Sequence, residues 1–233
     1  MIFTLLFLGC MEPAGEITLS GQILTGQDSG AGAPDITVSL RDSMTDPYSE
    51  AVTDENGEFS LAAPSNAVYH LALSGEGVAP TAFSGVVGQA DLAIPADLLF
   101  VRTLLEVEAY RTAFQNCAAA DLSGGITEGV LEYRLKNTTD DSYLIAEEAF
   151  VEVFDQNGTQ YETCYLDNDG ESLELGSAIG ATGRFMAFGI PEGPTTLIFK
   201  QDFGGLSIEN FAFVYMPEDG IAPFHPAFID LAG

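Results

Sequence analysis

The chain has 233 residues, enough for one large domain or for two domains of about 100 to 120 residues each. Hydrophobic residues make up 46% of it, which excludes an intrinsically disordered chain, and frequent Gly and Pro between short apolar runs favour β structure. With 35 acidic and 7 basic residues the net charge is -28, and such a surface repels the phosphate backbone of nucleic acids. We therefore expect no nucleic-acid partner.

The amino-terminal segment is uniformly apolar over residues 2–8 and leads into Gly9 and Cys10. It is too short to cross a membrane as a helix, which takes about 20 residues, so a secretory signal or a buried first strand would explain it. The string Phe-Leu-Gly-Cys at 7–10 resembles the lipobox of bacterial lipoproteins, although no Lys or Arg precedes it. The resemblance implies a signal peptide over 1–10 that ends at a lipidated Cys10, and an exported protein anchored by lipid to the outer membrane of the bacterial cell envelope.

The three cysteines are an odd number, which in an exported protein calls for an explanation. Lipidation of Cys10 would leave Cys117 and Cys164 as a pair, and a disulfide between them would contribute a few kcal/mol by closing a long loop. Two buried thiols are the alternative. The histidines, His70 and His225, lie far from both cysteines in sequence, so we predict no metal site and no cofactor.

Short alternating stretches separated by turn residues run from residue 17 to about residue 93. Residues 18–24 and 35–40 are predicted strands, since their apolar residues repeat with a period of two. Asn56-Gly57 is typical of a tight turn that needs positive φ. Strands that recur every 10 to 15 residues or so favour an antiparallel sandwich over βαβ units.

Two of these stretches also carry a family resemblance. They read Gly-Ala-Pro-Asp-Ile-Thr-Val-Ser-Leu at 32–40 and Thr-Asp-Glu-Asn-Gly-Glu-Phe-Ser-Leu at 53–61, followed by Pro64 and Tyr69. Together they resemble the carboxypeptidase regulatory-like domain, a seven-stranded, transthyretin-like β-sandwich. One departure is Asn66-Ala67, where that family has a glycine before the Tyr strand, and Asn can serve the same turn.

A helix is predicted after the first group of strands. Thr103 and Glu106 form a capping-box pattern, in which Thr is the N-cap and Glu lies three residues on. The helix should extend to about Gln115. A partial apolar stripe that includes Leu104 and Leu105 predicts that it packs against one or both sandwiches.

The strand pattern then repeats in a degenerate form, which indicates a second copy of the unit. A generic immunoglobulin-like sandwich is the alternative. A glycine corresponding to the missing family glycine is present at Gly193. The corresponding stretches are 129–133, 149–154, 182–188 and 195–199, with a last strand at 208–216.

These patterns predict an all-β fold, with two transthyretin-like or immunoglobulin-like antiparallel β-sandwiches in tandem joined by a short helix. The first sandwich should span 17–95, the linker with its helix 96–125, and the second sandwich 126–216. The Pro-rich end at 217–233 is expected to be irregular.

No pattern of catalytic residues is present in the sequence. It lacks a Gly-x-Ser-x-Gly elbow, a Walker loop, a Gly-x-Gly-x-x-Gly fingerprint and clustered His and Glu ligands, so we predict no catalytic residue and no enzyme. The acidic string 167–171 begins like a calcium loop, but Ser172 and Ala178 stand where an EF-hand needs Gly and Glu. A hairpin turn at Asp169-Gly170 explains the same residues.

The sequence therefore predicts a non-enzymatic envelope lipoprotein with a binding or structural role. Besides the membrane that holds its lipid anchor, its partner would be a protein bound at an edge strand or a glycan bound by exposed aromatic residues, for which Tyr143, Tyr161 and Tyr165 are the candidates. A surface adhesin or carbohydrate-binding accessory protein is the alternative. A less favoured one is a hydrolase with an acidic site, formed by Glu147 with Glu148 or by Asp167 with Asp169.

Overall fold

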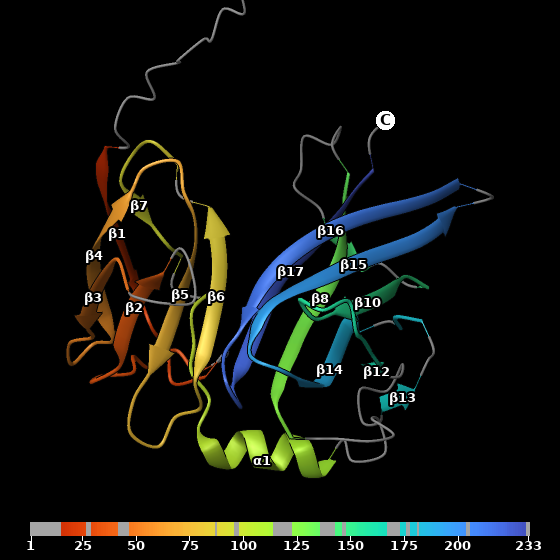
Figure 1. Cartoon of the computed structure of the whole chain (residues 1–233), viewed down its shortest axis with the longest axis horizontal. Coiled ribbons are helices and arrows are strands. Elements are labelled where there is room, and N and C mark those ends of the chain that lie inside the picture. Colours follow the sequence, from red (N-terminus) through yellow and green to blue (C-terminus); the bar gives the residue numbers. More distant parts are fainter. Residues whose placement is uncertain are drawn as a thin grey trace, which may run out of the picture.

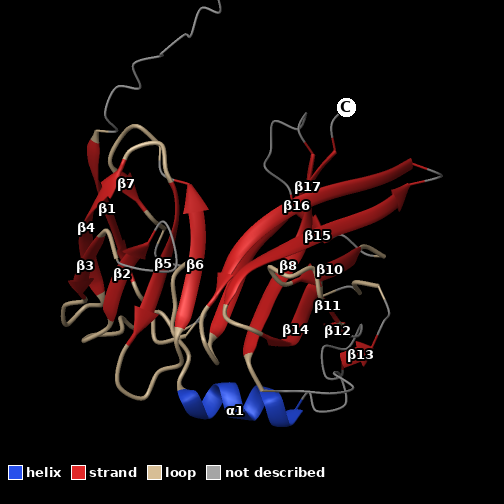
Figure 2. Cartoon of the chain, viewed as in Figure 1, coloured by secondary structure: helices blue, strands red, loops and turns tan. Residues whose placement is uncertain are grey.

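The structure is a computed structural model, and strands dominate it. It describes residues 15–26, 29–41, 47–86, 88–95, 98–113, 123–135, 143–145, 148–166, 173–175, 178–180, 182–203 and 206–231. One helix, α1, accompanies the strands in these ranges (Figures 1 and 2). The predicted β class is confirmed.

The first half of the chain forms two facing groups of strands. Its strands are β1 (Glu16–Gln22), β2 (Thr37–Arg41), β3 (Ser49–Val52), β4 (Glu58–Pro64), β5 (Val68–Ser74), β6 (Thr81–Val86) and β7 (Leu92–Ala93). They are ordered β4-β1-β7 in one sheet and β3-β2-β5-β6 in the other. Alternate apolar residues such as Leu19, Val38, Leu61 and Leu71 point between the sheets and form one buried core.

Two turns of this half adopt the backbone that their residues predict. Gly57 has φ 79°, and the Asp54 carboxylate accepts hydrogen bonds from the backbone N–H groups of Asn56 and Glu58. Asn66, which was predicted to serve the second turn, has φ 56°. The prediction that Asn serves this turn is confirmed, because Asn tolerates the left-handed region better than most residues do.

Helix α1 (Leu104–Ala113) begins at the predicted cap. The Thr103 hydroxyl accepts a hydrogen bond from the Glu106 N–H at 3.1 Å, and the Glu106 carboxylate accepts one from the Thr103 N–H at 2.7 Å. The predicted apolar stripe is wrong, since Leu104 and Leu105 are exposed. The side of α1 that carries Val107 is buried instead, because that side faces the second half of the chain. In the part of the chain that the structure describes, no helix has the length and apolar character needed to span a membrane.

The second half repeats the strand pairing of the first. Its strands are β8 (Gly125–Leu135), β9 (Tyr143–Ile145), β10 (Phe150–Phe154), β11 (Gln160–Tyr161), β12 (Thr163–Leu166), β13 (Leu173–Leu175), β14 (Arg184–Ile190), β15 (Gly193–Phe203), β16 (Leu206–Met216) and β17 (Ile221–Leu231). The order β14-β8-β17 corresponds to β4-β1-β7, and the order β11-β10-β15-β16 corresponds to β3-β2-β5-β6. In both halves the last strand pairs in parallel with the first. A second core, with Leu131, Val153, Phe185 and Leu197 among its members, fills the space between these sheets.

The expectation that residues 217–233 are irregular is wrong for most of that segment. Residues 221–231 form β17, which pairs in parallel with β8. The pairing is interrupted between Phe224 and Ala227, and Pro226 lies within this irregularity. A proline is tolerated there because no ladder hydrogen bond requires its missing N–H.

Strand β17 also joins the two halves. Ile221 pairs in parallel with Thr81 of β6, so one ten-stranded sheet runs through both halves of the chain. The Ile221 N–H donates to the Pro80 carbonyl at 2.8 Å. Sequence patterns predicted two sandwiches joined by a helix, whereas the structure adds this shared sheet.

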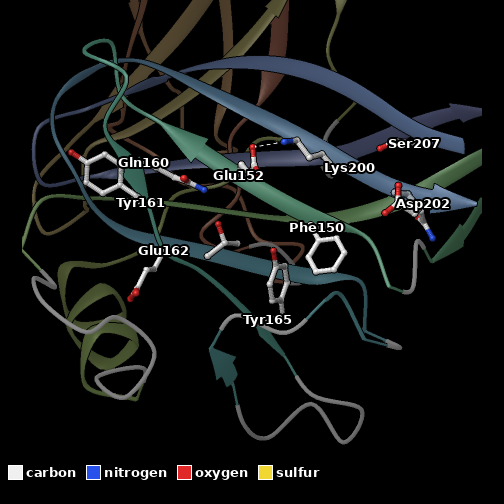
Figure 3. Close-up of a pocket in the computed structure, with 11 residues that line it drawn as sticks. Phe150, Glu152, Gln160, Tyr161, Glu162, Tyr165, Lys200, Asp202 and Ser207 are labelled. Carbon is white, nitrogen blue, oxygen red and sulfur yellow. Dashed lines mark ion pairs between the residues drawn. The ribbon is translucent and has the colours of Figure 1, made fainter. Parts of the chain in front are cut away.

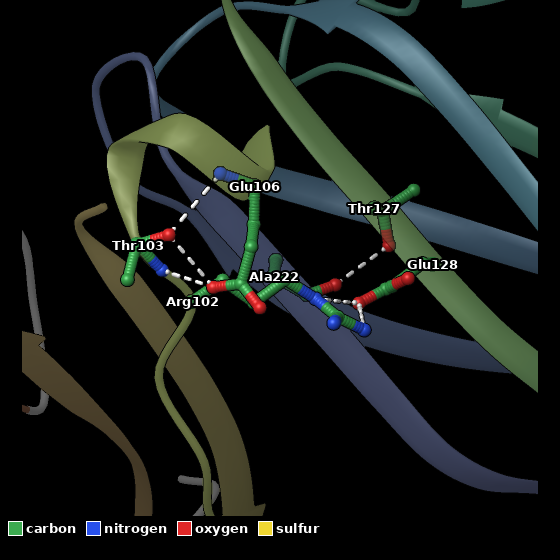
Figure 4. A network of polar contacts seen from close by, with 6 residues as sticks. All are labelled: Arg102, Thr103, Glu106, Thr127, Glu128 and Ala222. Carbon is green, nitrogen blue, oxygen red and sulfur yellow. Dashed lines mark hydrogen bonds and ion pairs between the residues drawn. The ribbon is translucent and has the colours of Figure 1, made fainter. Parts of the chain in front are cut away.

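A buried ion pair lies at the junction of the halves (Figure 4). Arg102, which immediately precedes the helix cap, donates through Nε and Nη2 to one carboxylate oxygen of Glu128 on β8, at 3.0 and 2.8 Å. The guanidinium also lies over the rings of Phe100 and Tyr110, with distances to the ring centroids of 5.1 and 4.8 Å. Both charged side chains are almost fully buried, so the pair fixes the linker against the second half.

A ring stack forms a second contact between the halves. His70 on β5 stacks on Tyr215 of β16, with ring centroids 4.3 Å apart and planes inclined by 10°. The Tyr215 N–H donates to Ser84 Oγ on β6 at 3.1 Å, and the Tyr215 hydroxyl donates to the Glu192 carboxylate at 2.9 Å. The outer face of β5 and β6 is thereby docked on the end of β16.

Candidate binding site

A pocket of about 380 Å³ lies beside the edge of β10 that faces away from β15 (Figure 3). Its walls come from β10, from the segment that crosses between sheets at β11 and β12, and from the far end of the β15–β16 hairpin. The lining residues are Phe150, Glu152, Gln160, Tyr161, Glu162, Thr163, Tyr165, Lys200, Gln201, Asp202 and Ser207. We call this the β10-edge pocket, and its volume falls in the range of small-molecule sites.

The inner wall of the β10-edge pocket contains buried polar groups. Tyr165 and Gln201 are both buried. Thr163 is 8% exposed, and its hydroxyl has no hydrogen-bond partner among the residues that the structure describes. A buried hydroxyl without a partner is costly and rare, so water or a ligand is expected to complete it.

The outer rim of the pocket combines an aromatic ring with charges. Phe150 is 44% exposed. Lys200 Nζ lies 2.8 Å from a carboxylate oxygen of Glu152 and 3.6 Å from one of Glu209. The hydrogen bond to Glu152 is the main cause that raises the pKa of Lys200 above its ordinary value. This single cation is therefore already neutralised by neighbouring carboxylates.

A second feature is the outer face of the β15–β16 hairpin, which carries exposed aromatic side chains. Phe211 and Phe213 of β16 are 60% and 69% exposed. They lie across from Ile198 and Thr196 of β15, and Phe154 of β10 continues the row beyond Thr196. We call Phe154, Ile198, Phe211 and Phe213 the aromatic face. Neighbouring exposed apolar side chains of this kind are typical of interaction surfaces.

Strand β16 is also the end strand of the order β11-β10-β15-β16. Phe203 pairs with Leu206, and in this register the even-numbered residues of β16 bond to β15 while the odd-numbered ones direct their N–H and C=O groups outward. The Tyr215 N–H, which reaches Ser84 on β6, follows this alternation. The backbone of Phe211 and Phe213 therefore faces away from the sheet.

Two of the three predicted contact aromatics line the β10-edge pocket. The Tyr161 hydroxyl donates to the Asp155 carboxylate at 3.2 Å, and burial followed by the charge of Asp155 raises the pKa of Tyr161. Tyr165 is buried, and its hydroxyl bonds to the backbone of Val151. The side chain of Tyr143 lies outside the described residues, although its backbone belongs to β9.

Of the two cysteines in the predicted disulfide, the structure describes only Cys164. Cys164 is completely buried on β12, in a cluster with Val107 of α1. Cys10 and Cys117 lie outside the described residues. The pairing of Cys117 with Cys164 therefore stays a prediction.

The remaining polar candidates do not come together as a site. His70 is buried in the stack with Tyr215, and the side chain of His225 lies outside the described residues. Glu148 is exposed, whereas Glu147 and the acidic string 167–172, with Asp167 and Asp169, lie outside them as well. Among the residues that are described, no group of three or more His, Cys, Asp or Glu could hold a metal ion.

Sequence reasoning missed the residues that dominate both surfaces. Phe211 and Phe213 were available as a signal, because they lie two positions apart on a strand whose opposite face, with Val214 and Met216, is also apolar. A strand with apolar residues on both faces is either covered on both faces or leaves one apolar face exposed to solvent. Phe150 and Thr163 carried no such signal, since the pocket exists only where β10 meets β12.

Comparison with known proteins adds no family. No protein-family model matches the chain, and no curated protein matches its sequence. A chain of a type II cohesin–X–dockerin complex from Acetivibrio cellulolyticus is 21% identical with a TM-score of 0.29, over 37% of this chain and 58% of that one. The minor pilin of Streptococcus agalactiae (11% identity, 93% and 95% covered) and a candidate carbohydrate-binding protein from Bacteroides uniformis (11%, 87% and 98%) have TM-scores of 0.30 and 0.31. Scores this low assign neither a ligand nor a site.

Proposed function

We propose that the chain is a non-enzymatic binding protein of the cell envelope that captures an extended segment of a partner protein along β16. The observation that carries the proposal is the outward backbone of β16 beside two exposed phenylalanines, Phe211 and Phe213. Strand addition uses those two elements together. Main-chain hydrogen bonds supply affinity, and pockets or rings for alternate side chains supply specificity.

Strand β16 is the least protected of the described sheet edges whose side chains can be assessed. It has 11 residues, no proline and a single charged side chain, Glu209. By contrast β3 has 4 residues, β7 has 2 and β4 ends at Pro64. Natural sheets shield their edges by shortness, proline or charge, so an edge that lacks these protections favours an interface.

The edge of β10 provides an internal comparison. Its Val151 N–H and C=O groups also point away from the sheet, but the Tyr165 hydroxyl occupies both. One edge of the same four-stranded sheet is thus closed by a side chain and the other is open. The expected partner segment carries alternate apolar residues to meet the aromatic face, with basic residues at its ends, since Glu192 and Glu209 flank that face in a chain of net charge -28.

The test has two steps, both with the full chain. A photo-crosslinking residue placed at Phe213 in envelopes of the producing cells identifies the partner, with the same residue at Val52 on the edge of β3 as the matched exposed control. Hydrogen exchange of the purified complex then reports the mode of binding. Amides of Phe211 and Phe213 should gain protection, whereas those of the even-numbered residues, already bonded to β15, should change little.

The outcomes are distinct. Phe213→Glu should weaken the complex by at least about tenfold, because it places a charge in an apolar contact. Val52→Glu should leave it unchanged. Equal crosslinking at Val52 and Phe213, or protection that does not alternate along β16, would overturn the proposal.

We also propose that the two halves are tandem copies of one transthyretin-like sandwich. The support is the matching strand order, β4-β1-β7 with β3-β2-β5-β6 in one half and β14-β8-β17 with β11-β10-β15-β16 in the other. The resemblance of residues 32–69 to the carboxypeptidase regulatory-like domain is a separate support. Fold alone assigns no reaction to such a unit.

Export and lipidation at Cys10 remain part of the proposal. They rest on the lipobox-like string at residues 7–10 and would hold the chain at the envelope, where an oxidising compartment allows a bond between Cys117 and Cys164. Intact mass of the protein extracted from membranes, with thiol alkylation before and after reduction, tests both. An acylated chain that begins at Cys10 and gains two alkylations only after reduction is expected. A chain with three free thiols and no acyl group would contradict it.

A further inference from the structure

We propose that the β10-edge pocket binds a neutral sugar ring. The pocket meets β16 only at Ser207, near the Leu206 end of that strand, and none of its residues belongs to the aromatic face. The proposal assigns the pocket a chemical class of ligand, a pyranose or the end of a glycan chain, and stands or falls independently of strand addition at β16.

The shape of the pocket matches such a ligand. A pyranose presents C–H groups on its faces and hydroxyls around its rim. The pocket offers the exposed ring of Phe150 and the partly buried ring of Tyr161 as apolar surfaces. Around them stand carboxylate, amide and hydroxyl groups of Glu152, Gln160 and Ser207, which suit hydroxyl partners.

Thr163 supplies the observation that points to a ligand rather than to a mere surface hollow. Thr163 lines the pocket and is more than nine-tenths buried, and its hydroxyl has no hydrogen-bond partner in the described part of the chain. A hydroxyl can both donate and accept, as can each hydroxyl of a sugar. A sugar hydroxyl at this position would remove the cost of leaving Thr163 Oγ1 unsatisfied.

Fixed side chains make the site rigid before a ligand arrives. The hydrogen bond from the Tyr161 hydroxyl to Asp155 sets the orientation of that ring, and the bonds of Tyr165 to Val151 set the inner wall. Neither tyrosine hydroxyl is needed for the ligand. A preorganised wall lowers the entropy cost of binding, which matters for a small polar ligand.

Charge selects a neutral ring over an anionic one. Three carboxylates line the pocket, from Glu152, Glu162 and Asp202, and its only lining cation is Lys200. Lys200 is already paired with Glu152 at 2.8 Å. An anionic sugar would meet net negative charge with no unpaired cation on the lining, so acidic glycans should be rejected.

Sugars that have the same pyranose ring but differ in charge provide the test. Saturation-transfer NMR with the full chain compares glucose, glucuronate and glucosamine, which differ in charge, followed by galactose, mannose and N-acetylglucosamine. We expect transfer to at least one neutral sugar at millimolar affinity and little to glucuronate. Transfer to none of the neutral sugars would overturn the proposal, and so would transfer to glucosamine without glucose, which indicates a cation site.

Variants then locate the site. Phe150→Ala should weaken binding by about threefold to tenfold, the loss expected when one stacking contact is removed. Tyr48→Ala, at an exposed aromatic residue of the first half and outside the pocket, is the matched control and should leave sugar affinity unchanged. Equal losses in both variants, or no loss in Phe150→Ala, would overturn the assignment.

Thr163→Val adds a readout that a folding defect cannot imitate. It removes the hydroxyl with little change in shape, so sugar affinity should fall by about threefold to tenfold, the usual net contribution of one hydrogen bond. The unfolding transition in urea should not move to lower concentration, because the wild-type hydroxyl has no described partner. A destabilised Thr163→Val protein, or one with unchanged affinity, would contradict the role given to Thr163.

Discussion

The hydroxyl of Tyr165 on β12 bonds to both backbone groups of Val151 on β10: it accepts from the N–H at 2.9 Å and donates to the carbonyl at 3.3 Å. Residues 151 and 153 direct their backbone away from β15, and β11 covers only Val153 and Phe154. The tyrosine thus takes the place of a missing strand. It closes this edge to pairing with other chains and forms the inner wall of the β10-edge pocket.

Tyr165→Phe should therefore destabilise the protein by about 1 to 3 kcal/mol, because two buried backbone groups lose their partner. Urea unfolding monitored by circular dichroism measures the change. Tyr161→Phe removes a hydroxyl from a more exposed bond to Asp155 and should cost less. A larger loss in Tyr161→Phe would contradict the importance of the capped edge.

The ion pair between Arg102 and Glu128 should behave as a buried pair. Arg102→Met leaves the Glu128 carboxylate buried without its partner and should cost about 3 to 5 kcal/mol of unfolding free energy. The double variant Arg102→Met with Glu128→Leu removes both charges, so it should regain most of that loss. A double-mutant cycle from urea unfolding checks this, and strictly additive losses would show that the two charges are not coupled.

The cap of α1 is a local feature with a local cost. Thr103→Ala removes the hydroxyl that accepts from the Glu106 N–H, and we expect a loss of about 1 kcal/mol. Leu105→Ala is the matched control on the same helix. Leu105 is 83% exposed, so its truncation should change stability by less than about 0.5 kcal/mol. Comparable losses in the two variants would argue against the cap.

The contact between the halves should weaken at high pH. Burial, followed by the hydrogen bond to Glu192, raises the pKa of Tyr215 from 10.0 to about 12. Since the folded state holds this proton more tightly, the contribution of Tyr215 is complete below pH 10 or so and is lost as the pH rises towards about 12. The difference in unfolding free energy between wild type and Tyr215→Phe should shrink over that interval. A constant difference would contradict it.

Local features of the fold were predictable because their causes lie within a few residues. Alternation placed Val38 and Leu61 towards the core, and the capping box placed the start of α1 at Thr103. The left-handed turn at Asn66 was expected from the family resemblance together with the tolerance of Asn for positive φ. The prediction of an apolar stripe on α1 was wrong, because the neighbouring strands decide which side of a short helix is buried. They bury Val107 instead of Leu105.

By itself, then, the sequence determined the β class, the turns and the helix cap, because side-chain period, backbone preference and capping act over short distances. Only the tertiary structure decided that β17, with its prolines, runs beside β8 and meets β6 at Ile221. It also decided that β10 is capped by Tyr165, while β16 has no strand paired to its outer side among the described residues. These outcomes depend on which strands meet, and strand pairing between distant residues leaves no periodic signature in the chain.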